Sequence, residues 1–365
     1  MNLVEYQKSK KNCFLAFVNN KLADTDGALK TVRAFSSRGY CFEKICFVAF
    51  NNSTEIMNAL SDGVNFHENV VVYCPLTMEK TFKDYFESAL AAKFDGLNML
   101  KSSSVNVFIF VYDACRKLTV NDVCDFLDNL YGVSYGKAFV KTVGAPLQLL
   151  DDALKDAKSI CPELEFAVTD DYGDCRTEIT YDNAIPKSVF DRAYRAVVAR
   201  LNGYIYALED VTLAERLVQL LKLRRMKIAV AESFTGGGVG GKIVEVSGAS
   251  EVFTEGVNAY ANESKVARLG VDELILKQYG AVSAQTAEQM AMGLINRGVC
   301  DVSVSTTGIA GPNSDNTKKP VGLAYIGVGS ADGATVYEYN LKGKRKEVTQ
   351  TAINLALFAV YKSLK

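Results

Sequence analysis

The chain has 365 residues, enough for about two or three domains that each bury a core of their own. Its 41 Lys and Arg residues nearly balance 42 Asp and Glu residues, so the formal net charge is -1 and no overall positive field exists to attract a nucleic-acid backbone. Apolar residues make up 48% of the chain, and no apolar run approaches the roughly 20 residues of a membrane span. We therefore expect a cytoplasmic protein that binds neither nucleic acid nor membranes.

The counts of histidine and cysteine restrict the chemistry further. The chain has one histidine, His67, and nine cysteines without a C-x-x-C pair. This excludes a multi-histidine metal site and a histidine base in the second half of the chain. The odd number of cysteines predicts reduced, mostly buried thiols, with neither a disulfide framework nor a zinc site. If the protein is an enzyme, its proton transfers must use Lys, Tyr, Asp, Glu or Cys.

The first ~135 residues alternate apolar runs with amphipathic stretches. This βαβ rhythm predicts a mostly parallel sheet with both faces covered. The predicted strands span 13–18, 45–50, 70–74 and 105–111. No glycine-rich turn follows any of them: after Cys74 the chain continues as Pro75-Leu76-Thr77, where a phosphate-binding loop would need glycines.

The pattern changes to a smaller α+β unit over residues 136–208. Helices are predicted over 147–157 and 188–201, and strands over 164–168 and 176–181, without a catalytic constellation. Thr212-Leu213-Ala214-Glu215 is a capping box that starts a helix with one apolar face. We accordingly predict a multidomain α/β chain with three domains, 1–135, 136–208 and 209–365.

Two turns rich in small residues follow predicted strands in the last domain. A strand over 227–231 runs into Glu232-Ser233-Phe234-Thr235-Gly236-Gly237-Gly238, and a strand over 302–306 opens into Thr307-Gly308-Ile309-Ala310-Gly311-Pro312. Such turns expose backbone N–H groups that favour an anion or a developing oxyanion. Ligands of α/β sheets bind beyond the carboxyl ends of strands, so two such turns indicate a site, although each alone is compatible with a tight connection. Further strands are predicted over 257–260, 321–328 and 335–340, and helices over 264–269, 284–296 and 346–362.

Candidate reactive residues follow in Ser250, Tyr260 and Lys265. Their spacing is also compatible with a surface serine, a half-buried tyrosine and a solvated lysine. Without a histidine, however, a serine can be activated only by a desolvated lysine, directly or through a tyrosine hydroxyl. Four cations in residues 342–346 precede the last helix, either as a solvated basic face or as an anchor for a substrate phosphate.

Seven motifs of the last domain stand in a fixed order: Ala-Glu-Ser-Phe-Thr-Gly-Gly at 231–237, Gly-Ala-Ser at 248–250, Tyr-Ala-Asn-Glu-Ser-Lys at 260–265, Gly-Ala-Val-Ser at 280–283, Thr-Gly-Ile-Ala-Gly-Pro at 307–312, Lys-Pro-Val-Gly at 319–322 and Gly-Lys-Arg at 343–345. In order and spacing they resemble the CinA C-terminal domain. The resemblance covers residues 210–365, and residues 136–208 more weakly resemble the middle domain of full-length CinA proteins.

Members of that family are nicotinamide-nucleotide amidases, which hydrolyse nicotinamide mononucleotide to nicotinic acid mononucleotide and ammonia in pyridine-nucleotide salvage. The resemblance implies that Ser250, Tyr260 and Lys265 are catalytic, with Lys265 removing the proton of Ser250 directly or through Tyr260 to form an acyl-enzyme. It implies a substrate-binding set of Ser233, Thr235, Gly236, Thr307, Gly308, Ala310, Gly311 and Arg345, with Arg345 at the nucleotide phosphate. It also implies a homodimer, and no metal or cofactor.

Three positions or regions depart from the family pattern. Phe234 stands where a cysteine is usual, and Lys344 where an acidic residue is usual. The first domain resembles a molybdopterin-binding fold associated with metal-dependent ADP-ribose pyrophosphatase activity, but Tyr73–Met78 replaces the glycine-rich loop. We expect that domain to be a degenerate scaffold, which disfavours a pyrophosphatase. The other alternative is a non-catalytic nucleotide-binding or assembly protein, in which Phe234 blocks productive binding.

Overall fold

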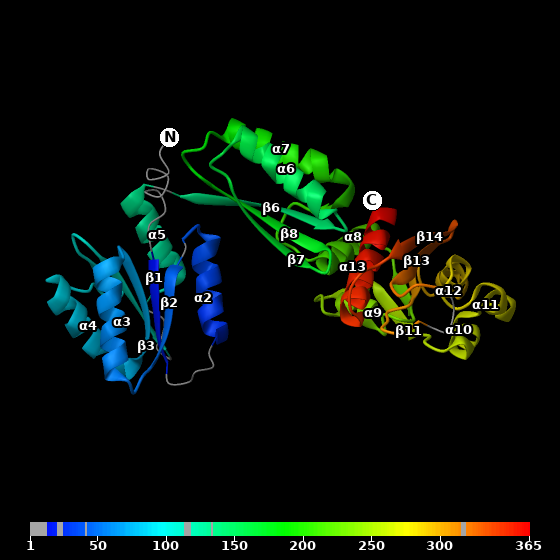
Figure 1. Ribbon diagram of the computed structural model, residues 1–365, viewed down its shortest axis with the longest axis horizontal. Coiled ribbons are helices and arrows are strands. Elements are labelled where there is room, and N and C mark those ends of the chain that lie inside the picture. Colours follow the sequence, from blue (N-terminus) through cyan, green and yellow to red (C-terminus); the bar gives the residue numbers. More distant parts are fainter. Residues whose placement is uncertain (1–12, 20–24, 41, 113–117, 133, 315–318) are drawn as a thin grey trace. The chain divides into compact units, whose positions relative to one another are not determined.

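The computed structural model describes residues 13–19, 25–40, 42–112, 118–132, 134–314 and 319–365 (Figure 1). The chain divides into two compact units, Met1–Lys137 with Thr180–Pro186, and Ala138–Ile179 with Lys187–Lys365. The predicted multidomain α/β class is confirmed, because parallel sheets with helices occur in both units. The finer division into three domains stays a prediction.

The first unit is built on a five-stranded sheet in the order β2-β1-β3-β5-β4. All its pairs are parallel except β4 with β5. The strands are β1 (Cys13–Asn19), β2 (Phe42–Ala49), β3 (Asn69–Pro75), β4 (Met99–Lys101) and β5 (Asn106–Tyr112), and the helices are α2 (Thr25–Ser37), α3 (Ser53–Phe66), α4 (Leu76–Leu90) and α5 (Val120–Tyr131).

Alternate residues of β3 in this sheet enter different apolar clusters, as the pleat requires. Val70 and Val72 pack with Leu60 of α3, whereas Val71 packs with Leu127 of α5. The sheet is therefore covered on both faces, as predicted. β3 ends at Pro75 and α4 begins at Leu76, so the chain passes from strand to helix without a loop.

A four-stranded sheet in the order β7-β8-β6-β9 follows. Its elements are β6 (Tyr135–Val143), α6 (Leu147–Ile160), β7 (Glu165–Asp171), β8 (Asp174–Asp182), α7 (Lys187–Leu201), the 3-10 turn Asn202–Tyr204 and β9 (Ile205–Ala207). The two helices and β7 and β8 match the predicted segments, whereas β6 and β9 were not predicted. Only the second half of β6 is buried, which explains why it shows no continuous apolar run.

The last sheet has the order β11-β10-β12-β13-β14, and β11, β10 and β12 run parallel. Its strands are β10 (Ile228–Glu232), β11 (Phe253–Asn258), β12 (Val302–Gly308), β13 (Leu323–Ser330) and β14 (Gly333–Asn340). The helices are α8 (Leu213–Arg224), α9 (Gly238–Val244), α10 (Asn262–Leu269), α11 (Glu273–Tyr279), α12 (Ala284–Asn296) and α13 (Arg345–Ser363). The predicted capping box is present, since Thr212 and Glu215 exchange hydrogen bonds at the start of α8.

Helices cover both faces of this last sheet. Residues of α8, α9 and α13 form one apolar cluster with Ile228 and Val230, whereas α10 and α12 pack on Ala229 and Ala231. Figure 1 shows α10, α11 and α12 grouped together beside the sheet. The face that carries α10 is the one on which the candidate site lies.

Three further observations concern the described part of the chain. None of its helices is long and apolar enough to cross a bilayer. None of its groups of His, Cys, Asp and Glu side chains could hold a metal ion with three or more ligands. The cysteines whose side chains the structure describes are free, namely Cys46, Cys74, Cys124, Cys161, Cys175 and Cys300.

Candidate functional site

The site lies at the carboxyl edge of the last sheet, where three parallel strands end side by side. Glu232 of β10 is in register with Asn258 of β11 and with Thr306 of β12. The next residue, Ser233, donates its backbone N–H to the Thr306 carbonyl over 3.0 Å. On the other side, Ala259 donates its N–H to the Glu232 carbonyl over 2.8 Å. Main-chain bonds to both neighbouring strands therefore fix Ser233.

Lys265 points from α10 at this edge. Its Nζ lies 3.1 Å from Ser233 Oγ, 2.9 Å from the Ala259 carbonyl oxygen and 3.1 Å from the Tyr260 carbonyl oxygen. The residue is fully buried, with 0% of its surface exposed. Burial lowers the pKa of Lys265 from 10.5 to about 8, against a smaller opposing influence of Glu263.

These three partners fit both protonation states of the amine: an ammonium donates to all three oxygens, and a neutral amine donates to two of them and can accept a proton from the hydroxyl. The two carbonyl oxygens can only accept hydrogen bonds, so they take the two N–H groups of a neutral lysine. When Lys265 is protonated, Nζ donates to Ser233 Oγ; when it is neutral, the remaining lone pair can accept from the Ser233 hydroxyl in the same place. Lys265 is thus placed to remove the Ser233 proton, and this is the geometry of a serine nucleophile with its base.

Within this chain the structure does not bring Ser250 to Lys265, so the predicted direct activation of Ser250 by Lys265 gains no support from the geometry and stays a prediction. Ser250 lies in the 3-10 turn Ala249–Glu251, which precedes β11, whereas Lys265 meets the residues that follow β11. The six residues of β11 separate the two by roughly 20 Å at about 3.3 Å per residue. The partner of Lys265 is Ser233, which the motif comparison had placed only among the binding residues.

Tyr260 contributes to the site in a different way from the predicted proton relay. Its carbonyl oxygen accepts from Lys265, whereas its side chain is 66% exposed and its hydroxyl accepts from Arg345 Nη2 over 3.2 Å. Arg345 also donates from Nη1 to the Gly311 carbonyl over 2.8 Å. Arg345 therefore connects the segments after β11 and β12 at an exposed rim.

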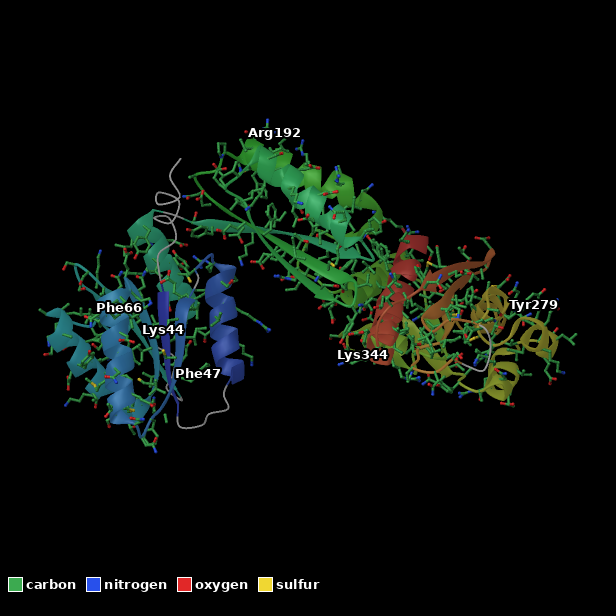
Figure 2. The ribbon with its side chains drawn as sticks, in the orientation of Figure 1. Lys44, Phe47, Phe66, Arg192, Tyr279 and Lys344 are labelled. Carbon is green, nitrogen blue, oxygen red and sulfur yellow. The ribbon has the colours of Figure 1, made fainter. Side chains whose placement is uncertain are left out.

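Arg345 is the first residue of α13, directly after Lys344, which Figure 2 labels. A guanidinium has five donors, and the two bonds just described use part of them. The predicted residues Gly311 and Arg345 are therefore together at one rim, which carries an exposed positive charge.

The glycine-rich turn after β10 is organised by Glu232, whose role the sequence reasoning missed. The residue is 1% exposed. Its carboxylate accepts from Thr235 Oγ1 (2.7 Å) and from the backbone N–H groups of Gly237 (3.0 Å), Val239 (3.0 Å) and Gly240 (2.9 Å). Three N–H groups of the turn, which were expected to face a ligand anion, are therefore bonded to this side chain. The sequence signal that could have revealed this role is a carboxylate residue at the end of an otherwise apolar strand.

Two backbone N–H groups next to Ser233 are candidate donors for an oxyanion. The Gly236 N–H is bonded to the Ser233 carbonyl over 3.1 Å, and Glu232 accepts from several of the residues beyond it. For the N–H groups of Phe234 and Thr235 the described residues supply no acceptor. In the turn after β10 these two groups are the candidate donors, and the turn over residues 308–311 stays the alternative source of donors.

The other predicted binding residues lie at the edge but are tied to the protein. Thr235 Oγ1 lies 2.6 Å from Thr306 Oγ1 in addition to its bond with Glu232, and Thr307 Oγ1 donates to the Ala281 carbonyl over 2.7 Å. Gly308 ends β12, where an added Cβ would lie 2.9 Å from the Leu323 carbonyl oxygen. The two threonines hold the edge through their hydroxyls and Gly308 allows the close approach of a neighbouring strand, whereas contact of these residues with substrate stays a prediction.

Phe234, the residue that departs from the family pattern, packs in an apolar cluster. It is 6% exposed and lies with Ala310, Ala324, Val348 and Ala352. Its ring is therefore part of the core between the sheet and α13.

Residues 210–364 match the family model described as the CinA C-terminal domain. A putative competence-damage inducible protein of Caldicellulosiruptor saccharolyticus is 42% identical over 183 residues, which are 50% of this chain and 44% of the relative. A CinA-like protein of Chlorobaculum tepidum is 45% identical over 149 residues, 40% of this chain and 35% of the relative. The chain thus spans less than half the length of these two curated relatives. Among solved structures, the chain is similar to the competence/damage inducible protein CihA from Agrobacterium tumefaciens, with 34% sequence identity and a TM-score of 0.40. The match covers 42% of this chain and 93% of CihA.

Proposed function

Because the chain belongs to the CinA family, we propose that its residues 209–365 form an amidohydrolase that converts nicotinamide mononucleotide to nicotinic acid mononucleotide and ammonia. The observation that carries the proposal is the buried Lys265 amine 3.1 Å from the Ser233 hydroxyl. A lysine with a lowered pKa activates a serine without a histidine, and the chain has none beyond His67. We assign the nucleophile to Ser233 in place of Ser250.

The acylation step follows from this geometry. Neutral Lys265 takes the Ser233 proton while Oγ forms a bond to the carboxamide carbon. The resulting oxyanion is held by the N–H groups of Phe234 and Thr235, at roughly 3 kcal/mol for each donor. Lys265 then gives its proton to the nitrogen, the C–N bond breaks, and ammonia leaves an ester on Ser233.

Deacylation uses the same base. Lys265 takes a proton from water as the water oxygen attacks the ester carbon, and it returns the proton to Ser233 Oγ as the C–O bond breaks. The carboxylic acid is released and the original Ser233 and Lys265 are restored. No metal has a step in this sequence.

Arg345 is assigned to the nucleotide phosphate. Its exposed guanidinium is held by Gly311 and Tyr260, so it is pre-oriented for the paired hydrogen bonds that it makes with phosphate oxygens. Tyr260 then acts by orienting Arg345 and by binding Lys265 through its carbonyl. The homodimer and the cytoplasmic location stay predictions.

The test is ammonia release from nicotinamide mononucleotide by the full chain, with and without a chelator, beside Lys265→Met. We expect chelator-resistant turnover in the wild type and at least a roughly 1000-fold lower kcat in the variant, because the base is lost. A folded wild type without turnover would favour a binding protein. Turnover that the chelator abolishes would contradict the metal-free mechanism.

A further inference from the structure

We propose that Glu232 is a positioning residue whose buried carboxylate, together with the Thr235 and Thr306 hydroxyls, sets the turn that presents Ser233 to Lys265. The inference rests on the proposed function in treating Ser233 as the nucleophile.

The carboxylate gathers the chain that follows Ser233. Its donors are one hydroxyl and three backbone N–H groups, all within residues 235–240. A carboxylate only accepts hydrogen bonds, so it matches a set made entirely of donors. The main chain after Ser233 is thereby wrapped around one fixed anion.

A hydroxyl bridge ties this turn to the neighbouring strand. Thr235 Oγ1 donates its single proton to Glu232 Oε2, so the 2.6 Å contact with Thr306 Oγ1 is a bond in which Thr306 donates. Thr306 also accepts the Ser233 N–H through its carbonyl. The turn and the nucleophile are therefore anchored to the same residue of β12.

The main chain of Glu232 also holds the base. Its carbonyl accepts the Ala259 N–H over 2.8 Å, and the Ala259 carbonyl accepts from Lys265 Nζ over 2.9 Å. One residue thus joins both members of the reactive pair. An error of about 1 Å in such a pair costs on the order of 100-fold in rate.

Glu232 acts through its neighbours and not on the substrate. Successive side chains of a strand point to opposite faces, so Ser233 faces α10 while the Glu232 carboxylate lies against the start of α9. Its carboxylate accepts four hydrogen bonds, all of them from groups of the protein itself. Loss of the carboxylate should therefore lower kcat and leave the substrate KM in place.

The decisive comparison is Thr235→Val against Thr235→Ser in the full chain. Valine has the shape of threonine without the hydroxyl, whereas serine keeps both bonds. We expect Thr235→Val to lower kcat about tenfold or more with KM within about threefold, and Thr235→Ser, which restores the hydroxyl, to recover most of that loss in kcat. Glu232→Gln should lower kcat further, because the amide NH2 group would then face the N–H groups that bind the carboxylate in the wild type.

A second readout does not depend on the natural substrate. Phenylmethanesulfonyl fluoride forms a sulfonate ester on an activated serine, with fluoride as the leaving group, and peptide mapping locates it. We expect labelling at Ser233 in the wild type and in Thr235→Ser, and about tenfold slower labelling in Thr235→Val. All three proteins are first shown to be folded at the assay temperature. Labelling of Ser233 without hydrolysis of nicotinamide mononucleotide would refute the proposed substrate and leave this inference standing.

Three results would overturn the inference. Wild-type kcat and wild-type labelling in Thr235→Val would show that the hydroxyl bridge has no part in placing Ser233. A raised KM with unchanged kcat in that variant would make Thr235 a substrate contact. Absence of labelling at Ser233 in the wild type would show that the turn does not present a reactive serine.

Discussion

The pH dependence of turnover follows from the burial of Lys265. An ordinary lysine with a pKa of 10.5 is neutral in about 0.03% of molecules at pH 7, whereas Lys265 with a pKa of about 8 is neutral in about 9%. Raising the pH removes the proton, so activity that requires the neutral amine must increase. Between pH 6 and pH 9 the neutral fraction changes from about 1% to about 90%.

We expect kcat/KM for ammonia release to rise about tenfold per pH unit below pH 7.5 and to level off above pH 9. The assay is initial rates from pH 5.5 to 9.5 at constant ionic strength. The substrate phosphate titrates near pH 6, well below the expected midpoint, and nicotinamide riboside, which lacks the phosphate, provides the control. A profile that is flat or falls between pH 6.5 and 8.5 would refute the reasoning that a buried neutral lysine is the base.

Three further predictions concern the rim and the core. Arg345→Ala should raise the KM for the nucleotide about tenfold or more and leave the KM for the riboside unchanged. As a control, Lys344→Ala should change the KM of either substrate less than Arg345→Ala changes that of the nucleotide. Equal effects of Arg345→Ala on the two KM values would contradict the assignment of Arg345 to the phosphate. Gly308→Ala should lower stability by roughly 1–3 kcal/mol in thermal melts, because its Cβ would lie 2.9 Å from a carbonyl oxygen. Gly203→Ala is the control, since its Cβ would meet open space and the change in stability should be near zero. A wild-type melting temperature for Gly308→Ala would count against that contact. Phe234→Cys should cost roughly 2–4 kcal/mol of stability without a gain in turnover, and a gain would instead favour a pocket blocked by Phe234.

The sequence predicted most elements near the site, because they carry local signals. The apolar runs of β10 and β12 and the capping box at Thr212 are examples, and they match the structure. Lys265 and Arg345 were both identified as functional candidates, and both lie at the carboxyl edge. Lys265 was found because a serine without a histidine needs another base, and Arg345 because four cations precede the last helix; the family motifs support both.

The partner of Lys265 could not be found in the same way. The strand before Tyr260 was predicted over 257–260 but spans Phe253–Asn258. As an edge strand it is largely exposed and shows no apolar run, so its start was hidden in the sequence. The order was predicted, with Ser250 before the strand and Lys265 after it, but the six-residue length of β11, which sets their separation, was not. Which edge of a sheet a residue occupies is set by tertiary structure.

The most direct measurement of the central claim compares Ser233→Ala with Ser250→Ala for ammonia release from nicotinamide mononucleotide, with both variants shown to be folded. The pairing of Ser233 with Lys265 predicts that Ser233→Ala lowers kcat by at least about 1000-fold and that Ser250→Ala stays within about tenfold of the wild type. Wild-type turnover in Ser233→Ala together with loss of turnover in Ser250→Ala would contradict the account.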